Sequence, residues 1–473
     1  MDFMQSFTTV SLKGLTSEHW NRTRFLPCRG SRAFFIYSRE NAGSACRIEK
    51  FYDIMGLIAE KSTDGRLSSD NGPLSVGKEE NSQMKATIGC PMKQLQCGGC
   101  PLLDVPYPEQ LRRKQKTIES LFGRFCHPEP IIGMGMPFHY RNKAIATFSS
   151  ARGKLACGIY AAHTHHVVPV KDCLLQDSRI NEIIGAALFS AAKCHLPAYD
   201  EDRGTGFLRH MVVRRGTSTG EISVTVVTPS EYFPASRNFV RSLLEKCPDV
   251  TTVVQNINPC HTSAVLGTEE KILYGSGFIR DRLCGNTFCI SPRAFYQVNP
   301  SQTERLYQTA LEFSGLTGKE QVIDAYCGIG TISLAAAKYA GDVLGMEING
   351  DAVRDACWNA RLNGCENVDF VRGDAGKLMT EMAKEGGKAD LVFLDPPREG
   401  ASRQFLVSLL RLAPSRIVYI SCEPSTLARD SALLIKGGYE IRRVRPVDMF
   451  PHTQHIETVC LLVRCRKRQD GKL

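Results

Sequence analysis

The sequence predicts an α/β protein in which a doubly wound parallel sheet, from residue 291 onward, follows a mixed α+β domain. Strand and helix signals alternate through the C-terminal part, the order that builds a parallel sheet covered by helices. Short alternating segments separated by Gly, Asn and Pro turns occupy residues 139–291. Hydrophobic residues make up 42% of the 473 residues, which is enough for more than one core. We therefore expect a leader over residues 1–86, a mixed domain over 87–290 and a doubly wound domain over 291–473.

The first 48 residues are basic and rich in hydroxyl side chains, with seven Arg or Lys, three acids and ten Ser or Thr. This composition is typical of an organelle transit peptide and predicts a plastid or mitochondrial location. The alternatives are a disordered basic tail or a misplaced start, for which a cytoplasmic location is expected. Residues 61–84 are polar and rich in Ser, Gly, Asp and Glu, as in a linker.

The chain is basic overall, with 59 Lys and Arg against 49 Asp and Glu and a net charge of +10. Such an excess favours a polyanionic partner, and nucleic acid is the first expectation. No apolar run reaches the ~18 residues that a membrane span requires, so we expect no membrane partner. A monomer is expected. The 19 cysteines are scattered over a long chain without a secretory apolar segment, which indicates reduced thiols and a metal site.

Three cysteines near the start of the predicted mixed domain are closely spaced. Cys90, Cys97 and Cys100 follow the pattern C-x6-C-x2-C, and two glycines before the third let the backbone wrap around a bound centre. A closed site needs a fourth ligand, for which we select Cys173. The spacing alone does not separate zinc from an iron–sulfur cluster. Unliganded thiols or a disulfide are the alternatives.

A helix is predicted from Tyr107 to Phe125, with one apolar side and one basic side that includes Lys114. The basic side is suited to phosphate groups, and a solvated face explains it equally well. Two further segments, residues 140–143 and 209–215, are basic and partly aromatic. We expect them to contact phosphates and to stack on bases.

The doubly wound part begins with an apolar strand, a glycine turn and a helix over residues 321–339. In this Rossmann-like arrangement a ligand approaches the backbone at Gly328. The turn lacks the G-x-G-x-x-G spacing of dinucleotide sites, so S-adenosylmethionine is a better candidate than a nicotinamide or flavin cofactor. The next strand ends in Glu347, placed to accept hydrogen bonds from both ribose hydroxyls. Asp374 follows a third strand and is a candidate for the adenine amino group, and Asp395, fixed by two prolines, ends a fourth. Singly, each acid is equally explained as a strand-end cap.

Cys422 lies at the carboxyl end of a short buried strand, residues 416–420, directly before a proline turn. Open α/β sheets bind their ligands at that end, so this thiol is the candidate nucleophile. A packed, inert cysteine is the alternative. Glu457 stands two residues after His455 and enters the last apolar strand, residues 459–463. A carboxylate in this position is a candidate general base.

Together these motifs resemble the RNA uracil-5-methyltransferase family, in particular its iron–sulfur branch that modifies 23S-type ribosomal RNA. The resemblance extends from about Gly89 to the end of the chain. The matching patterns are C-x5-6-C-G-G-C, F-x-Q-V-N, D-x-x-C-G-x-G, D-P-P-R, S-C-x-P-x-T-x-x-R-D and H-x-E, at Cys90–Cys100, Phe295–Asn299, Asp324–Gly330, Asp395–Arg398, Ser421–Asp430 and His455–Glu457. The sequence departs from the family at Glu423 and Thr331, where Asn is usual.

The resemblance implies site residues and cofactors. The implied contacts to S-adenosylmethionine come from Gln297, Tyr326, Glu347 and Asp395, and a four-iron four-sulfur cluster is implied on Cys90, Cys97, Cys100 and Cys173. The same resemblance implies that Cys422 is the nucleophile and Glu457 the base.

The implied reaction methylates C5 of a uridine in RNA. Cys422 adds to C6 and makes C5 nucleophilic; after methyl transfer, Glu457 removes the C5 proton and the thiolate leaves. The target base must be unstacked, and we expect it to meet aromatics such as Phe295 and Tyr296. Ribosomal RNA is the expected substrate and transfer RNA the alternative. The competing functions are an amino-directed methyltransferase and a non-catalytic iron–sulfur RNA-binding protein, which require neither the thiol nor the base.

Overall fold

The computed structural model describes residues 25–27, 34–36, 89–151, 153–161, 164, 166–260 and 264–465. The chain divides into two compact units, Met1–Ala86 and Thr87–Leu473. In the first unit the described residues form two strands, β1 (Phe25–Pro27) and β2 (Phe34–Ile36), which pair antiparallel. The rest of the predicted leader lies outside the described residues, so the transit peptide stays a prediction. Within the described part of the chain, no helix is long and apolar enough to cross a membrane.

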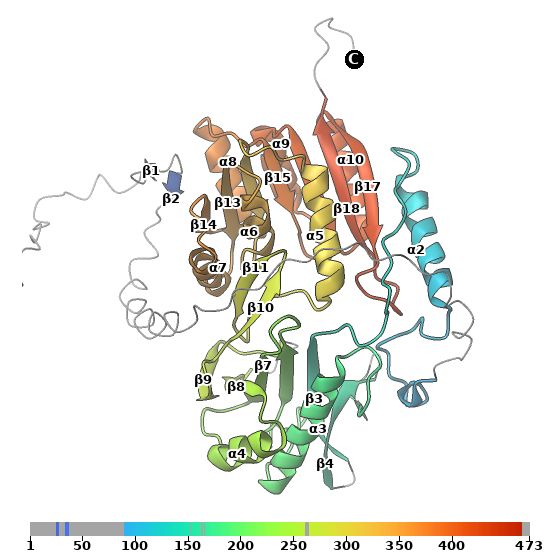
Figure 1. The fold of residues 1–473 in the computed structure, drawn as a ribbon, viewed down its shortest axis with the longest axis vertical. Helices are drawn as coiled ribbons and strands as arrows, with labels where there is room; N and C mark the ends of the chain where they lie inside the picture. Colours follow the sequence, from blue (N-terminus) through green and yellow to red (C-terminus); the bar gives the residue numbers. More distant parts are fainter. Residues whose placement is uncertain are drawn as a thin grey trace, which may run out of the picture. The chain divides into compact units, whose positions relative to one another are not determined.

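The C-terminal half of the second unit contains a seven-stranded sheet in the order β14-β13-β12-β15-β16-β18-β17 (Figure 1). Its strands are β12 (Gln321–Ala325), β13 (Asp342–Glu347), β14 (Val368–Arg372), β15 (Leu391–Leu394), β16 (Arg416–Ser421), β17 (Tyr439–Val447) and β18 (Glu457–Arg464). Strands β12 to β16 run parallel, whereas β18 is antiparallel to both β16 and β17. The order reverses direction between β12 and β15, which places a ligand crevice at the carboxyl ends of these strands. The predicted α/β fold is confirmed.

Helices alternate with these strands along the chain. They are α5 (Pro300–Ser314), α6 (Thr331–Ala337), α7 (Gly350–Leu362), α8 (Ala375–Lys384), α9 (Arg403–Leu412) and α10 (Pro424–Lys436). Short polar side chains begin several of them: Asn299 caps α5 and Ser402 caps α9, each accepting a backbone hydrogen bond. All four residues of β15 are buried, as expected for a central parallel strand covered on both faces.

A second seven-stranded sheet precedes this part, in the order β5-β4-β3-β6-β7-β8-β9. Its elements are β3 (Lys143–Ala151), β4 (Lys154–Tyr160), β5 (Val167–Pro169), α3 (Ser178–Lys193), β6 (His210–Arg215), β7 (Ile222–Thr228), α4 (Ser236–Lys246), β8 (Val250–Ile257) and β9 (Glu269–Tyr274). Pairing is antiparallel except between β7 and β8, which α4 connects as a crossover. Residues of α3 and α4 share a hydrophobic core with this sheet, here called the middle sheet. This arrangement agrees with the mixed α+β character predicted for this region.

In the described part of the second unit, η3 (Pro91–Lys93) and α2 (Tyr107–Phe122) precede the middle sheet. A hairpin of β10 (Ile279–Leu283) and β11 (Asn286–Ile290) lies between the two sheets along the chain. The helix α2 ends three residues earlier than predicted. The hairpin contributes to the same hydrophobic core as the C-terminal sheet. The domain boundary at residues 290 and 291 stays a prediction.

The predicted basic side of α2 is wrong at Lys114. This side chain is only 3% exposed, and its Nζ lies 2.5 Å from Oδ1 of the fully buried Asp448. Arg112 and Lys116 are exposed, as predicted. Lys114 therefore belongs to the interior, where a buried charge requires a partner.

The basic segments of the middle sheet also lie largely inside. Arg209 is 2% exposed and pairs with Glu201, and its Nη1 donates to the carbonyl oxygens of residues 258 and 260. Arg214 is 4% exposed and donates to the carbonyl oxygen of residue 294. Tyr140 is buried as well. The prediction that these side chains contact phosphates was wrong, because each one is buried and donates hydrogen bonds to carbonyl oxygens within the fold.

Gly345 of β13 leaves room for the ring of Phe370 on β14. A Cβ at Gly345 would lie 2.4 Å from a ring carbon of Phe370 and 2.9 Å from the sulfur of Cys327. We expect Gly345→Ala to lower the free energy of unfolding by about 1–3 kcal/mol, because overpacking displaces neighbouring side chains. The matched control is Gly185→Ala in α3, where no described atom lies within 4 Å of the new Cβ, and it should be neutral or stabilise by about 0.5–1 kcal/mol. Urea unfolding measures both variants, and equal midpoints would contradict this packing.

Candidate active site

Cys422 and Glu457 are brought together by the pairing of β16 with β18. Ser421, the last residue of β16, pairs with Thr458. Cys422, the residue after β16, is therefore opposite Glu457, the first residue of β18. Opposed residues of an antiparallel pair have Cα atoms about 4.5–5.5 Å apart. Glu457 is buried, and Cys422 is partly buried. The predicted nucleophile and the predicted base therefore lie side by side at the carboxyl end of β16.

Two further carboxyl groups lie at the ends of the neighbouring parallel strands. Asp395 directly follows β15, which pairs with β16 on one side and β12 on the other. Asp324, near the end of β12, is 1% exposed, and its Oδ2 accepts a hydrogen bond of 2.5 Å from Ser333 Oγ. In the described part of the chain, Oδ1 of Asp324 has no hydrogen-bond partner. This buried oxygen is therefore available to a ligand.

Burial raises the pKa of each acid and of the thiol at this site, and neighbouring carboxylates add to the rise in some of them. Burial raises the pKa of Asp324 to about 7, and the charge of Asp395 adds to the rise. Burial and the charge of Asp395 raise the pKa of Glu457, and burial raises that of Asp395. Burial, followed by the charges of Glu457 and Asp395, raises the pKa of Cys422 to about 11. A positively charged ligand among these groups would relieve the repulsion, so the site suits a cation.

Arg398 is a cation that opposes these effects. It lowers the pKa of both Cys422 and Glu457, although burial outweighs it in each. Its Nη2 lies 3.5 Å from Nε2 of His455, whose pKa is lowered by burial and then by Arg398. Sequence reasoning included both residues in matched motifs without giving them a role. The only signal was their place next to predicted catalytic residues.

The turn after β12 forms an open cradle. Gly328 and Tyr326 have φ angles of 54° and 68°, in the left-handed region that favours glycine and strains a tyrosine. No described atom lies within 4 Å of a Cβ placed on Gly328, so a ligand can approach the backbone there. Glu347 holds the turn: its Oε2 accepts from the Gly328 N–H at 3.1 Å, and its Oε1 accepts from the Asn349 N–H at 2.8 Å. Each oxygen keeps a second lone pair for other donors.

Two other predicted cofactor residues are Asp374, at the carboxyl end of β14, and Gln297, on the segment that enters α5. Asp374 follows β14 and caps α8, accepting from the Lys377 N–H at 2.9 Å. Gln297 is partly exposed on the segment before α5. The Asn of the F-x-Q-V-N motif, Asn299, serves the fold: it caps α5 and donates to the Met449 carbonyl oxygen at 2.8 Å.

The two aromatic residues predicted to meet the target base differ in exposure. Phe295 is 71% exposed, whereas Tyr296 is 3% exposed and contributes to the core of the C-terminal sheet. The stacking prediction was therefore wrong for Tyr296. Phe295 remains available on the surface.

The four cysteines predicted as metal ligands come from two segments of the chain. Cys90 precedes η3, and Cys97 forms an isolated bridge with Ala161. All four thiols are partly buried. Burial raises the pKa of Cys100 to about 11, and the charges of Cys97, Cys90 and Cys173 add to the rise, so the fold brings Cys173 near the other three. Among the described residues, no group of three or more His, Cys, Asp or Glu side chains is arranged to hold a metal ion.

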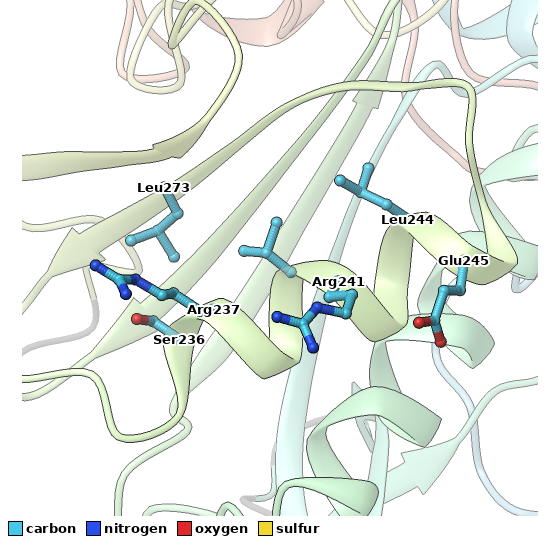
Figure 2. A pocket seen from close by; sticks show the side chains of 7 residues that line it. Ser236, Arg237, Arg241, Leu244, Glu245 and Leu273 are labelled. Carbon is cyan, nitrogen blue, oxygen red and sulfur yellow. The ribbon is translucent and has the colours of Figure 1, made fainter.

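A separate hollow of about 630 Å³ lies at the middle sheet, between α4 and β9 (Figure 2). It is lined by Ser236, Arg237, Val240, Arg241, Leu244, Glu245 and Leu273. None of the predicted site residues lines it. The hollow is therefore distinct from the candidate active site.

The chain is similar in sequence to known RNA methyltransferases. Residues 264–465 match the model of the tRNA (Uracil-5-)-methyltransferase family. A protein of Halalkalibacterium halodurans described as an uncharacterized RNA methyltransferase is 43% identical over 388 residues, 81% of this chain and 84% of the relative. A protein of Clostridium tetani with the same description is 40% identical over 417 residues, 86% of this chain and 90% of the relative.

A solved structure is similar over most of the chain. It is that of the Pyrococcus abyssi tRNA (uracil-54, C5)-methyltransferase in complex with S-adenosyl-L-homocysteine, with a TM-score of 0.66 and 27% sequence identity, and the match covers 78% of this chain and 86% of that one. Because relatives at 40% identity or more span most of both chains and the family model covers the whole C-terminal sheet, this chain belongs to the RNA uracil-5-methyltransferase family.

Proposed function

We propose that this chain transfers a methyl group from S-adenosylmethionine to C5 of a uridine in RNA. The observation that carries the proposal is the placement of Cys422 beside Glu457 at the end of β16, next to the strand that leads to Asp395. Methylation of an amino group requires neither a thiol nor a base in this position. A non-catalytic RNA-binding protein has no use for the pair either. The similar Pyrococcus abyssi enzyme, which acts on C5 of a uracil and was solved with S-adenosyl-L-homocysteine, supports both the reaction and the donor.

The residues of the site fit S-adenosylmethionine, which supplies a methyl group on a positively charged sulfur. The repulsion among Asp324, Asp395 and Glu457 suits that positive charge. The open backbone at Gly328 admits a nucleoside. The free lone pairs of Glu347 suit the ribose hydroxyls. The proposed cofactor contacts are Gln297, Tyr326, Gly328, Glu347, Asp374 and Asp395.

The proposed reaction uses the thiol first and the carboxylate afterwards. Cys422 gives up its proton to solvent, which Arg398 favours, and the sulfur bonds to C6 while the C5–C6 double-bond electrons form an enolate. C5 then forms a bond to the methyl carbon, and the bond from that carbon to the sulfonium breaks. Glu457 takes the proton from C5, the double bond re-forms and the C6–S bond breaks. This elimination frees the Cys422 thiolate and releases the methylated base from the protein.

Ribosomal RNA is the proposed substrate, and transfer RNA is the alternative. The cysteine pattern favours ribosomal RNA by analogy with the iron–sulfur branch of the family. The alternative is supported by the similar solved structure, that of a transfer RNA enzyme. Whichever RNA it is, the target base must leave its stack, and the exposed Phe295 offers a surface for it or for a neighbouring base. Mapping 5-methyluridine in both RNAs of cells that lack the protein distinguishes the two.

We further propose that Cys90, Cys97, Cys100 and Cys173 hold a four-iron four-sulfur cluster. Their mutual repulsion suits a cationic centre. Such a cluster binds one thiolate at each iron corner, so its ligands stay farther apart than the ligands of a single metal ion. The proposal is therefore compatible with the lack of a compact single-ion site in the described ranges. A cluster here would tie residues 90–100 to residue 173 and stabilise the fold.

For the leader, the composition of the first 48 residues supports delivery to a plastid or a mitochondrion.

The variants Cys422→Ala and Glu457→Ala should fail at different steps. Without the thiol, no RNA adduct forms and methyl transfer stops, whereas binding of S-adenosylmethionine persists because other residues hold it. Without the carboxylate, a methylated RNA stays joined to Cys422 and migrates as a denaturation-resistant band. Cys465→Ala, which removes an exposed cysteine, is the matched control and should behave as the parent. Full activity of Cys422→Ala would falsify the mechanism.

The rate of adduct release should rise with pH through the raised pKa of Glu457. The proton-accepting form is the carboxylate, so release is slow below that pKa and reaches its plateau above it. The midpoint should lie well above the ordinary glutamate value of about 4.3. Arg398→Gln removes a cation that lowers this pKa and should move the midpoint up, and Asp395→Asn removes an anion that raises it and should move the midpoint down. Single-turnover release measured from pH 5 to 9 tests this; shifts in the opposite directions would contradict the assignment.

Protein purified without oxygen should contain about four irons and about four acid-labile sulfides per chain. Cys97→Ser should remove most of the iron and lower the yield of folded protein, because the loop loses its link to the segment around Cys173. Cys126→Ser, at a partly buried cysteine outside the set, is the matched control and should keep its iron. Zinc in place of iron would refute the cluster.

A further inference from the structure

The connection that leads into Glu457 is held mainly by side chains from other parts of the fold. It runs from Asp448 to residue 456, between β17 and β18. Asn299 Nδ2 donates to the Met449 carbonyl oxygen at 2.8 Å, and Tyr140 OH donates to the Pro451 carbonyl oxygen at 3.1 Å. The position of the base therefore depends on residues remote in sequence.

The helix α2 supplies the charged part of this support. Lys114 Nζ donates to Asp448 Oδ1 at 2.5 Å and to the Phe450 carbonyl oxygen at 3.2 Å. Tyr107 OH donates to Asp448 Oδ2 at 2.8 Å. Lys114 and Asp448 are 3% and 0% exposed, so water does not screen the pair. One helix therefore fixes both oxygens of the carboxylate that begins the connection.

The same helix holds the strained middle of the connection. His452 has a φ of 65°, an unfavourable angle for a residue with a Cβ, and persists there because its surroundings fix it. Gln110 Oε1 accepts from the His452 N–H at 2.9 Å, and Gln110 Nε2 lies 3.1 Å from His452 Nδ1. The His452 ring also stacks on Phe138, with centroids 4.6 Å apart.

The cysteine-rich segment joins the same network. The Leu102 N–H donates to the His452 carbonyl oxygen at 3.0 Å, and the Leu102 carbonyl oxygen accepts from Gln110 Nε2 at 3.0 Å. Leu102 lies two residues after Cys100. A short chain of contacts therefore links the cysteine loop, α2 and the segment that carries the base.

Cys422 is supported differently. It follows β16, which pairs with β15 on one side and β18 on the other, so its place is fixed by the centre of the sheet. Glu457 also pairs with Val447, but it is the first residue of β18 and follows the connection directly, so its backbone is held by the sheet on one side and by the connection on the other. A change in the network should therefore move the carboxylate more than the thiol.

We propose that Gln110 and Lys114, through Asp448 and His452, are positioning residues for Glu457 and act on the release of the methylated RNA rather than on methyl transfer. The inference rests on the proposed function, because it assigns the release step to Glu457. A misplacement of about 1 Å can cost about 100-fold in rate. Loss of either side chain should therefore slow release by about 10- to 100-fold and change methyl transfer by less than about threefold.

The test is a single-turnover experiment with full-length protein, RNA and S-adenosylmethionine labelled in its methyl group. Total label in RNA reports methyl transfer, and label in the denaturation-resistant protein–RNA band reports adduct that awaits release. Gln110→Met and Lys114→Met should accumulate the band, as Glu457→Ala does. The matched control Lys116→Met changes an exposed lysine of the same helix and should leave the ratio of adduct to free product unchanged.

A purely structural role gives a different result. If the network serves stability alone, the folded fraction falls but each folded molecule keeps the parent ratio of adduct to free product, which would overturn the proposal. Lys114→Met leaves Asp448 buried without its cation and is expected to fold poorly. The double variant Lys114→Met with Asp448→Asn removes both charges and should recover yield without recovering the release rate. Gln110→Met provides the same readout without changing any charge.

The result with Glu457→Ala distinguishes a failure of the proposed function from a failure of the positioning role. An adduct in Glu457→Ala together with parent ratios in folded Gln110→Met would leave the proposed function standing and remove the positioning role. No adduct in Glu457→Ala would remove the base role of Glu457, and the positioning role with it.

Discussion

The antiparallel insertion of β18 between β16 and β17 is the constraint on which the candidate site depends. Thr458 pairs with Ser421 and Glu457 pairs with Val447, so both neighbours fix the same register. A slip of one residue would turn the carboxylate to the opposite face of the sheet, because side chains alternate along a strand. The residues of β18 from Glu457 to Leu462 are buried, so both faces of this part of the strand are covered. The pairing with both neighbours thus sets the geometry of the site.

The site is electrostatically unfavourable without a ligand. Asp324, Asp395 and Glu457 converge with little compensation, and Arg398 acts from an exposed position. In this state the thiol keeps its proton, because its raised pKa opposes the thiolate. A cysteine held as the protonated thiol reacts slowly with oxidants and alkylating agents. The same repulsion becomes an attraction when a cation binds among the acids.

Much of the C-terminal sheet and its site could be predicted from sequence because its signals are local. Each parallel strand is an apolar run followed by a functional residue, and Glu347 and Cys422 lie where the sequence places them. The basic segments of α2 and of the middle sheet were harder to interpret, since the periodicity of a basic segment does not reveal a remote partner. Lys114 finds Asp448 334 residues away, and Arg214 finds a carbonyl oxygen 80 residues away. Long-range pairs of this kind depend on the assembled fold and leave no pattern near the residue itself.

The place of β18 in the sheet has a consequence for the newly made chain. It is the last of the described strands in sequence but lies between two strands that are synthesised earlier. Until it emerges from the ribosome, β16 and β17 each present an unpaired edge, the kind of surface that templates aggregation. The thiol is also made before its carboxylate partner. Insertion of β18 pairs both strands and places Glu457 beside Cys422 in one event, so a chain that stops short of β18 keeps these edges exposed.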